Sequence, residues 1–540
     1  MIMKPALIFH SLLSAFLLLS YVNACPQVLS EQKWNADSLL KAAGGKSEKE
    51  YTVPSWTNLK KAVVAVKDNP ANAHLLSAAI HNLKPADMPY CIVMNINGNP
   101  RTGLAFNWFT NEGIQAGIVQ VVKGTSNSDK KFRKAIYSIT ASAIPVNDIP
   151  YSVKGNELKK LAGIPEGTRK SYTAHKAVIS NLKPGTTYSY RVGYEGRWSA
   201  PGTFRTAGES EKGFSFIYTA DPQATTESDF VISKTTSHAA FRLYPGVNFW
   251  LCTGDHINAS GENNSEWEWE QFFETQQDLL LKYPFTSVVG NHDKSPNRNF
   301  TYHFNTPYAE FDRQISTAPG SVYSFVYGDA LFLALSFEDY SKDGYLESLA
   351  EWMRREVENH PEVNWKIAFY HKNLYTGSVS HQDDNDGIIV RNRFAPLFDS
   401  LGIHLALQGH DHIYEVIGPL RNKKLVQGSV SGVVNVPRDI RENVTGKMNG
   451  VFNVSEGTLY FLNNSAGRKK YEPRPKEEMD ADEERLGVPG YYNLFTGRFG
   501  QTGRPAFSHV EVTREKITIT THEVFDDGTT KMFDRFEVVK

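Results

Sequence analysis

The feature that most constrains this chain is a series of short apolar runs that begins at Phe214. Six such runs follow one another up to residue 407, and each has the four to eight residues of a buried β-strand. Segments with helical periodicity lie between them, with apolar residues on one face in 265–282 and in 344–359. Strands that alternate with helices predict an α/β fold. Alternating segments later in the chain predict further strands, so we expect a layered α/β sandwich, two sheets flanked by helices, over residues 212–540.

Five of the six runs are followed by residues that can bind metal. In chain order these endings are Asp221-Pro-Gln223, Gly254-Asp255-His256, Gly290-Asn291-His292-Asp293, His371 and Gly409-His410-Asp411-His412. In open α/β sheets, ligands bind beyond the carboxyl ends of the strands, where loops from distant sequence positions converge. Chance can place one such residue after a strand, but five endings in one domain predict a shared site.

Each ending also has an ordinary structural explanation when it is taken alone. Gly254-Asp255 could form a plain turn, Asn291-His292 could cap a helix, and His371 could be a hydrogen-bonded core histidine. His410 and His412 lie two residues apart in an extended segment, so their side chains point to the same side. Because the same pattern recurs after five strands, we favour the shared site.

Upstream of the α/β region, residues 87–207 are expected to form a β-sandwich. Short strand-like segments separated by turn signals predict this architecture. Asn181–Val192 resembles the E–F corner of a fibronectin type III-like domain, and Trp198–Thr206 would form the last strand. Residues 126–172 are longer than a hairpin loop and rich in Lys and Ser, so we interpret them as an insertion.

The order Asp-x-Gln, Gly-Asp, Gly-Asn-His-Asp, His and Gly-His-x-His resembles the motif set of the dinuclear, calcineurin-like metallophosphoesterases. With the preceding β-sandwich, the chain is most similar to the purple acid phosphatases, over roughly residues 90–540. The resemblance implies a metal-dependent phosphoric ester hydrolase in which Asp255 bridges two metal ions. It also implies how the other ligands divide: Asp221 and His412 at the first ion, with Gln223 as a further candidate there, and Asn291, His371 and His410 at the second.

Not every residue of these motifs would bind metal. His292 stands at the family position that faces the substrate and helps to stabilise or protonate the leaving oxygen. Gln223 replaces a histidine that is a ligand in non-purple relatives, so it either offers its amide oxygen to the metal or only positions a water. His256 and His303 are further candidates for substrate contact, and a structural role is the alternative for each.

Two metal ions suit the chemistry that the resemblance implies. Phosphate esters are anionic, and two cations ~3.5–4 Å apart can clamp the phosphoryl oxygens during in-line displacement. Imidazole, carboxylate and amide oxygen together suit Fe, Zn or Mn and do not select among them. In the purple enzymes a tyrosine three residues after the bridging aspartate binds ferric iron and gives the colour, but here that position is Asn258. We therefore expect a colourless enzyme whose first site does not need Fe(III).

Residues 25–86 are expected to form a small helical module. Apolar residues recur at helix spacing in 59–66 and again in 75–80, with Asp68-Asn69-Pro70 as a turn between them. The stretch 51–83 resembles the three-helix FIVAR-type module of bacterial surface proteins. The alternative is a spacer that buries one small core.

Residues 1–24 have the layout of a secretory signal peptide. Lys4 precedes an apolar run, and Val22-Asn23-Ala24 offers small residues for cleavage before Cys25. The run is short for the ~20 residues that a membrane span needs, although a retained anchor is the alternative. Cys25 resembles the lipid-modified cysteine of bacterial lipoproteins, so a lipid anchor and simple release both stay open. We expect a secreted or extracytoplasmic protein with no transmembrane helix after signal removal.

Composition excludes several classes of protein. The 58 Lys and Arg against 59 Asp and Glu give a net charge of −1, which provides no field for bulk nucleic-acid binding. Three cysteines exclude a disulfide scaffold and a cysteine-rich zinc protein. Two of them, Cys91 and Cys252, are not expected to pair, and Cys252 is expected to be buried.

The leading hypothesis is a secreted or surface-tethered dinuclear enzyme that hydrolyses phosphomonoesters by attack of a metal-bound hydroxide, with His292 as the leaving-group acid. A phosphodiesterase or nucleotidase on the same site is the neighbouring alternative. A third hypothesis is a catalytically inactive cell-surface binding protein, which only the helical and fibronectin-like modules support.

Overall fold

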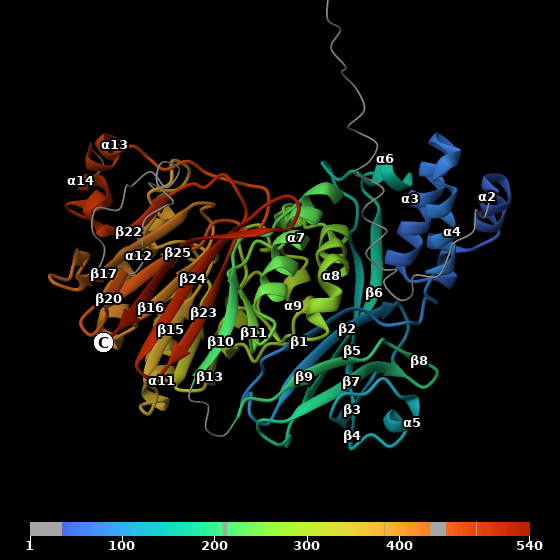
Figure 1. Cartoon of the computed structure of the whole chain (residues 1–540), viewed down its shortest axis with the longest axis horizontal. Coiled ribbons are helices and arrows are strands. Elements are labelled where there is room, and N and C mark those ends of the chain that lie inside the picture. The colour runs from blue at the N-terminus through green and yellow to red at the C-terminus, as the bar shows by residue number, and fades with distance from the viewer. Residues whose placement is uncertain (1–34, 209–212, 383, 432–449, 482) are drawn as a thin grey trace, which may run out of the picture. The chain divides into compact units, whose positions relative to one another are not determined.

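The computed structural model describes residues 35–208, 213–382, 384–431, 450–481 and 483–540 (Figure 1). Residues 1–24, which we predict to be a signal peptide, and Cys25 lie outside these residues. The chain divides into two compact units, one from residues up to 86 together with 157–165, and one from 87–156 together with 166–540.

The first unit is helical. Its elements are α2 (Ala36–Gly44), η2 (Glu48–Glu50), α3 (Val53–Asp68), η3 (Pro70–Asn72), α4 (Ala73–His81) and α6 (Leu158–Ala162). The Asn35 side chain accepts a hydrogen bond from the Ser38 amide at 3.0 Å and so caps α2. Buried Leu59, Val66 and Leu76 form the centre of a small core, as the helix spacing of these apolar residues predicts.

The second unit begins with a β-sandwich of two antiparallel sheets. One sheet has the strand order β1 (Tyr90–Asn95), β2 (Leu104–Asn111), β6 (Arg169–Ile179) and β5 (Ser142–Pro150). The other has β4 (Tyr137–Thr140), β3 (Ile118–Lys123), β7 (Thr187–Tyr194) and β8 (Arg197–Trp198), with β9 (Gly202–Arg205) also paired to β7 and the short helix α5 (Asp129–Phe132) after β3. Phe106, Trp108 and Tyr190 lie in the core between the sheets.

The interpretation of residues 126–172 as an insertion is wrong for most of its length. Strands β4 and β5 lie within this stretch, and each pairs with a strand of the sandwich. Side chains of β4 alternate between half-buried and exposed, so the strand contains no continuous apolar run by which it could be recognised in the sequence. Only 157–165 leaves the sandwich and belongs to the helical unit.

Two eight-stranded sheets form the rest of the second unit. The first has the order β12 (Phe285–Ser287), β11 (Phe249–Cys252), β10 (Gly213–Thr219), β23 (Ala506–Thr513), β24 (Lys516–Val524), β25 (Thr530–Val539), β20 (Gly450–Asn453) and β19 (Val430–Ser431). The second has β13 (Tyr323–Tyr327), β14 (Ala330–Ala334), β15 (Trp365–Phe369), β16 (Leu405–Gln408), β21 (Thr458–Leu462), β17 (Tyr414–Arg421) and β18 (Lys424–Leu425), with β22 (Phe495–Gly500) paired to β17. An aromatic-rich core that includes Phe216, Phe249 and Phe332 fills the space between them.

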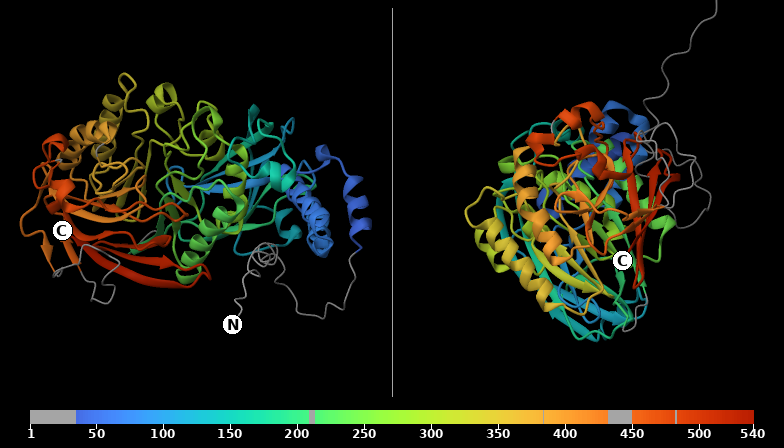
Figure 2. Two further views of the ribbon diagram at one scale, coloured as in Figure 1. Left: turned by 90° about the horizontal axis from the view of Figure 1, so that it is seen from above. Right: turned by 90° about the vertical axis from the view of Figure 1, so that its left-hand side faces the viewer.

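Helices cover the outer faces of both sheets, which gives the layered sandwich that the sequence predicts (Figure 2). Helix α7 (Glu227–Leu243) packs on β23 and on α8 (Glu266–Leu280). Helices α11 (Tyr345–Asn359) and α12 (Asn385–Leu401) bury Leu349 and Phe398 in a second core beside the other sheet. The remaining short helices are η4 (Gly261–Asn263), α9 (Asn299–His303), α10 (Glu310–Ile315), α13 (Lys476–Ala481), α14 (Glu483–Leu486) and η5 (Tyr491–Leu494).

The β-sandwich is fastened to α8 through buried polar contacts. The Gln277 side chain bonds both the amide and the carbonyl of Ile92, at 3.0 and 2.8 Å. Lys170 and Glu270 form an ion pair with side chains 6% and 0% exposed. Because these groups are removed from water, each depends on its partner, and the contacts fix α8 against the β-sandwich.

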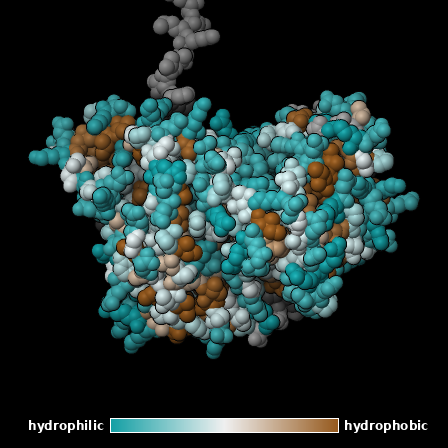
Figure 3. All heavy atoms as spheres, turned by 180° about the vertical axis from the view of Figure 1, so that it is seen from behind, coloured by the Kyte–Doolittle hydropathy of each residue, from teal (hydrophilic) through white to brown (hydrophobic). Residues whose placement is uncertain are grey.

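Polar side chains cover most of the face seen in Figure 3, and apolar ones lie in separate groups. Large exposed apolar residues come from different elements, among them Ile136, Leu243 and Met532. Within the described part of the chain, no helix is both long enough and apolar enough to cross a membrane. Cys91 and Cys252 are buried and carry free thiols.

Candidate metal centre

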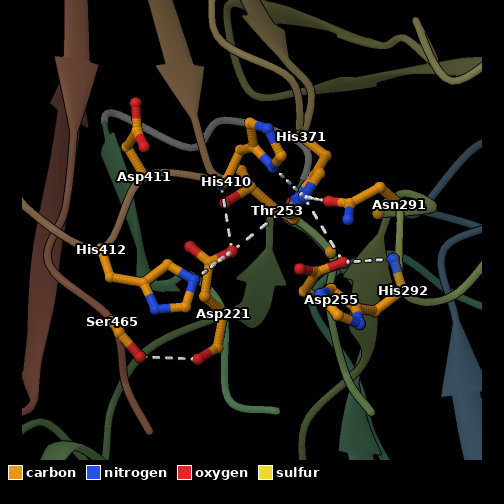
Figure 4. Close-up of polar contacts among 12 residues, drawn as sticks. Asp221, Thr253, Asp255, Asn291, His292, His371, His410, Asp411, His412 and Ser465 are labelled. Carbon is orange, nitrogen blue, oxygen red and sulfur yellow. Dashed lines mark hydrogen bonds and ion pairs between the residues drawn. The ribbon is translucent and has the colours of Figure 1, made fainter. Parts of the chain in front are cut away.

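The polar residues that follow the strands meet at one place (Figure 4). Asp221 follows β10, Asp255 follows β11 and Asn291 follows β12, all from the first sheet, whereas His371 and His410 follow β15 and β16 of the second. The five strands are neighbours within their sheets and run parallel, so their carboxyl ends lie together. The side chains of Asp221, Asp255 and His371 each bring one ligand atom within 4.8 Å of the others.

Unusual backbone conformations aim these side chains inward. Asp221, Asp255 and His410 have φ angles of 51°, 53° and 74°, in the left-handed region that costs non-glycine residues of the order of 1–3 kcal/mol each. Glycines make room beside them, because a Cβ on Gly290 would lie 2.1 Å from Asp255 Oδ1. Local backbone strain therefore coincides with the site, as is common where a fold holds functional groups in place.

We call the group of Asp221 and His412 the first half of the site and the group of Asn291, His371 and His410 the second half. Four lone-pair donors converge in the second half and at the adjoining Asp255. His371 Nδ1 donates to the Thr253 carbonyl at 2.8 Å, so Nε2 is the ring atom that can bind either a second proton or a metal ion. That Nε2 faces Asn291 Oδ1 at 2.9 Å, His410 Nδ1 at 3.2 Å and Asp255 Oδ1 at 3.4 Å. Acceptor atoms this close together need a proton or a metal cation between them, and this set of imidazole, amide and carboxylate atoms fits a metal ion.

The first half of the site contains buried polar atoms that lack partners. His412 Nε2 lies 3.7 Å from Asp221 Oδ1, which also accepts a hydrogen bond from the His410 amide at 3.0 Å. No described residue forms a hydrogen bond with Asp221 Oδ2 or with His412 Nδ1, and both side chains are almost fully buried. Leaving such groups unpaired is costly, and a bound cation would satisfy the carboxylate oxygen.

The electrostatics of the site also favour a cation. Burial raises the pKa of Asp221 well above its usual range, and the nearby Asp255 charge adds to this effect. Burial alone would lower the pKa of His371, but Asp255 and Asp221 raise it to about 10. Two carboxylates therefore create a field that attracts positive charge to the centre of the site.

His292 lies at the rim and is held in a defined orientation. Its backbone amide donates to Asp255 Oδ1 at 2.9 Å, and its Nδ1 bonds to the Asn258 carbonyl. A carbonyl can only accept, so Nδ1 carries the hydrogen and Nε2 is left for another partner. The side chain is half-buried, unlike those of Asp255 and His371.

Gln223 contacts Asp255 through its nitrogen. In the amide orientation that satisfies both of its polar atoms, Nε2 donates to Asp255 Oδ2 at 3.1 Å and Oε1 accepts from Lys469 Nζ at 2.7 Å. The amide oxygen that could bind metal is thus bonded to a lysine. This geometry favours a positioning role for Gln223 over direct ligation.

His256 and His303 do not join the cluster. His256 is fully buried, with Nδ1 at 2.9 Å from Asp293 Oδ2 and Nε2 at 2.7 Å from Ser287 Oγ. His303 is also fully buried, bonded to Glu266 at 3.0 Å and stacked on Trp269. Both positions support the structural alternative and not the substrate contact.

Sequence reasoning missed two residues beside the site. His381 stacks on His410 with ring centroids 4.0 Å apart and bonds Asp384 at 2.7 Å, so these three residues form a second potential metal-binding group. Tyr471 stacks on His412 at 4.5 Å. Both lie in irregular loops, where the pattern of polar residues after strands gives no prediction. His381 could still have been considered a candidate ligand from its residue type and its place in the loop after His371.

Comparisons with known protein families agree with this architecture. Residues 89–206 match the purple acid phosphatase N-terminal domain, and residues 228–414 match the calcineurin-like phosphoesterase domain. The chain thus combines a purple acid phosphatase N-terminal domain with a calcineurin-like phosphoesterase domain.

Individual relatives are distant. An uncharacterized protein of Mycobacterium tuberculosis is 25% identical over 45% of this chain and 51% of its own length. An acid phosphatase type 7 of Danio rerio is 26% identical over 47% of this chain and 60% of its own length. The chain therefore spans about half to three fifths of these two relatives. The solved structure of purple acid phosphatase PPD1 from yellow lupin seeds shares the fold, with a TM-score of 0.58 at 13% identity over 85% of this chain and 77% of that one.

Proposed function

We propose that this protein is a dinuclear metal-dependent phosphoesterase that hydrolyses phosphomonoesters. The observation that carries the proposal is that Asn291 Oδ1 and Asp255 Oδ1 lie 2.9 and 3.4 Å from His371 Nε2, next to the unpaired oxygen of Asp221. Such a set of metal-binding atoms, at the strand ends of this fold, favours phosphoester hydrolysis.

The residues divide into two groups of ligands around one shared carboxylate. We assign Asp255 as the carboxylate that both ions share, with Asp221 and His412 as ligands of one ion and Asn291, His371 and His410 as ligands of the other. Fe, Zn or Mn ions bound there would supply Lewis-acid charge for the phosphoryl oxygens and for activation of the nucleophile. The Thr253 carbonyl fixes the His371 tautomer, which keeps Nε2 directed at the site.

His292 is the residue that we assign to protonation of the leaving oxygen. Its Nδ1 is occupied by the Asn258 carbonyl, so Nε2 is the atom that can hold and release a proton toward a substrate. Asn258 stands where the purple enzymes carry their iron-binding tyrosine, and here its main chain orients the acid. A positioned general acid is typically worth ~10²–10⁴-fold in rate.

A scan of aryl phosphate monoesters and diesters with added Mn, Zn or Fe tests this proposal. We expect metal-dependent turnover that is faster for monoesters than for diesters. Preference for diesters would favour the phosphodiesterase alternative, and no turnover with any metal-loaded protein would favour the inactive binding protein.

We also propose that the protein is secreted or tethered at the cell surface, on the support of the signal-like residues 1–24 and of Cys25. Fractionation of expressing cells and mass spectrometry of the mature N-terminus test this. A mature chain that begins at Cys25 with an added lipid supports tethering, and one that retains Met1 in the cytoplasm contradicts the proposal.

A further inference from the structure

A basic segment that the motif pattern does not mark, residues 466–471, lies against the first half of the site. Its start is fastened to the β10 ending, because the Ala466 amide donates to the Ala220 carbonyl at 2.8 Å. Ser465 Oγ donates to the Asp221 carbonyl at 2.7 Å (Figure 4). At its end the Tyr471 amide donates to the His412 carbonyl at 3.1 Å. The segment is therefore fastened at its start beside Asp221 and at its end to His412, which are both candidate metal ligands.

The three consecutive cations of this segment differ in their surroundings. Arg468 is exposed and pairs with Asp229 at 3.1 Å, and Lys470 is exposed and bonds the Gly503 carbonyl. Lys469 is half-buried and instead donates to Gln223 Oε1 at 2.7 Å. Since Gln223 in turn bonds Asp255, the Lys469 ammonium lies one side chain away from the bridging carboxylate.

Lys469 has the donors to bind a further anion. Its ammonium carries three N–H groups, and the bond to Gln223 is the one seen for it among the described residues, so two donors remain. Asp255, Asp221 and Glu268 are the acidic groups that act on it electrostatically. A lysine ammonium is a compact charge that suits phosphate oxygens.

We propose that Lys469 is a substrate-binding residue that selects phosphomonoester dianions over phosphodiesters. This inference rests on the proposed function and names the substrate class of the same site. A monoester at neutral pH carries a second negative charge that a diester lacks, and a fixed ammonium beside the first half of the site offsets that charge. A diester gains less from the same contact and must also place a second ester group near the lysine.

The test compares Lys469→Met, Lys469→Arg and the matched control Lys470→Met, which removes an equal charge from the neighbouring exposed position. The readouts are kcat/KM for p-nitrophenyl phosphate and for bis-p-nitrophenyl phosphate, the inhibition constant of inorganic phosphate, and metal equivalents per chain. We expect Lys469→Met to lower monoester kcat/KM and phosphate affinity by about ten- to a hundredfold, the usual range for a lost charged hydrogen bond, and to change diester kcat/KM much less. Lys469→Arg should recover part of the loss, and Lys470→Met should behave as wild type.

Two outcomes would overturn the assignment. One is an equal fall for both esters with phosphate affinity unchanged. The other is a gain of bound metal in Lys469→Met, which would mean that the lysine takes the place of the first ion. Phosphate binding to the metal-loaded protein can be measured by calorimetry even without turnover, so failure of the Lys469 assignment is distinguishable from failure of the proposed enzyme activity.

Discussion

The two halves of the candidate metal centre are built differently. In the second half, His371 Nε2 lies within 3.4 Å of donors from Asn291, His410 and Asp255. In the first half, Asp221 Oδ1 and His412 Nε2 are 3.7 Å apart, and the amide oxygen of the neighbouring Gln223 is bonded to Lys469. The second half has the fuller set of metal ligands, whereas the first combines fewer ligands with a cation that can contact substrate. We infer that the second half binds its ion more tightly.

Asp255, the carboxylate that we propose both halves share, is the position at which one substitution tests both halves at once. Asp255→Asn keeps the shape of the side chain but removes the charge that both halves use. We expect kcat/KM to fall by more than the roughly 10²–10³-fold that loss of one fixed electrostatic contact costs. Steady-state assays with an aryl phosphate monoester and metal analysis by mass spectrometry measure this. Turnover left intact in Asp255→Asn would refute the enzyme hypothesis.

His292 belongs to neither set of metal ligands, so its replacement should affect the chemical step without affecting metal binding in either half. We expect His292→Ala to lower kcat by roughly 10²–10⁴-fold for a poor leaving group, as loss of a general acid does. The deficit should shrink as the leaving group becomes more acidic, because such a group needs no proton. A rate loss that is independent of the leaving group, or a loss of bound metal, would show that His292 does not act as the acid.

The difference in metal affinity can be measured with one histidine from each half. His371→Ala should weaken metal binding at the second half by more than the roughly 10–100-fold that loss of an outer-shell partner costs. His412→Ala should release one ion and leave the other bound at close to its original affinity. Equilibrium dialysis of the two variants measures the affinities, and identical losses from both would remove the distinction between the halves.

The smallest expected effect concerns colour. Asn258 supplies no phenolate, so the protein loaded with iron should lack a visible charge-transfer band. Tyr471 is the tyrosine to control for, because its ring stacks on His412 beside the first half. A visible band that disappears in Tyr471→Phe would contradict this expectation, because it would mean that the Tyr471 phenolate binds iron.

The strands that carry the site were predictable because a buried strand is a short apolar run and the residue after it is free to be polar. This signal located Asp221, Asp255 and His371 together. It did not decide between substrate contact and a structural role for His256, since proximity to a ligand in sequence does not determine whether a side chain faces the site or the aromatic core behind it. It gave no information on His303, which lies in the short helix α9 and does not follow a strand. Strand β4 was missed for a related reason, because half-buried Tyr137 and Ile139 alternate with exposed polar residues and form no continuous apolar run.

Lys469 and His381 could not be located from sequence spacing. Both lie in irregular segments whose positions depend on tertiary anchors, such as the Ser465 hydroxyl bonded to the Asp221 carbonyl. Local periodicity contains no information about such anchors. The first half of the site, which depends most on these segments, was accordingly the less predictable half.

Metal titration of the wild-type chain tests the central claim most directly. Protein stripped with a chelator and titrated with Zn or Mn should bind two equivalents in two separable steps, and His412→Ala should lose the weaker step alone. Binding of no metal, or retention of both equivalents after replacement of His371, would contradict a centre formed by these strand endings.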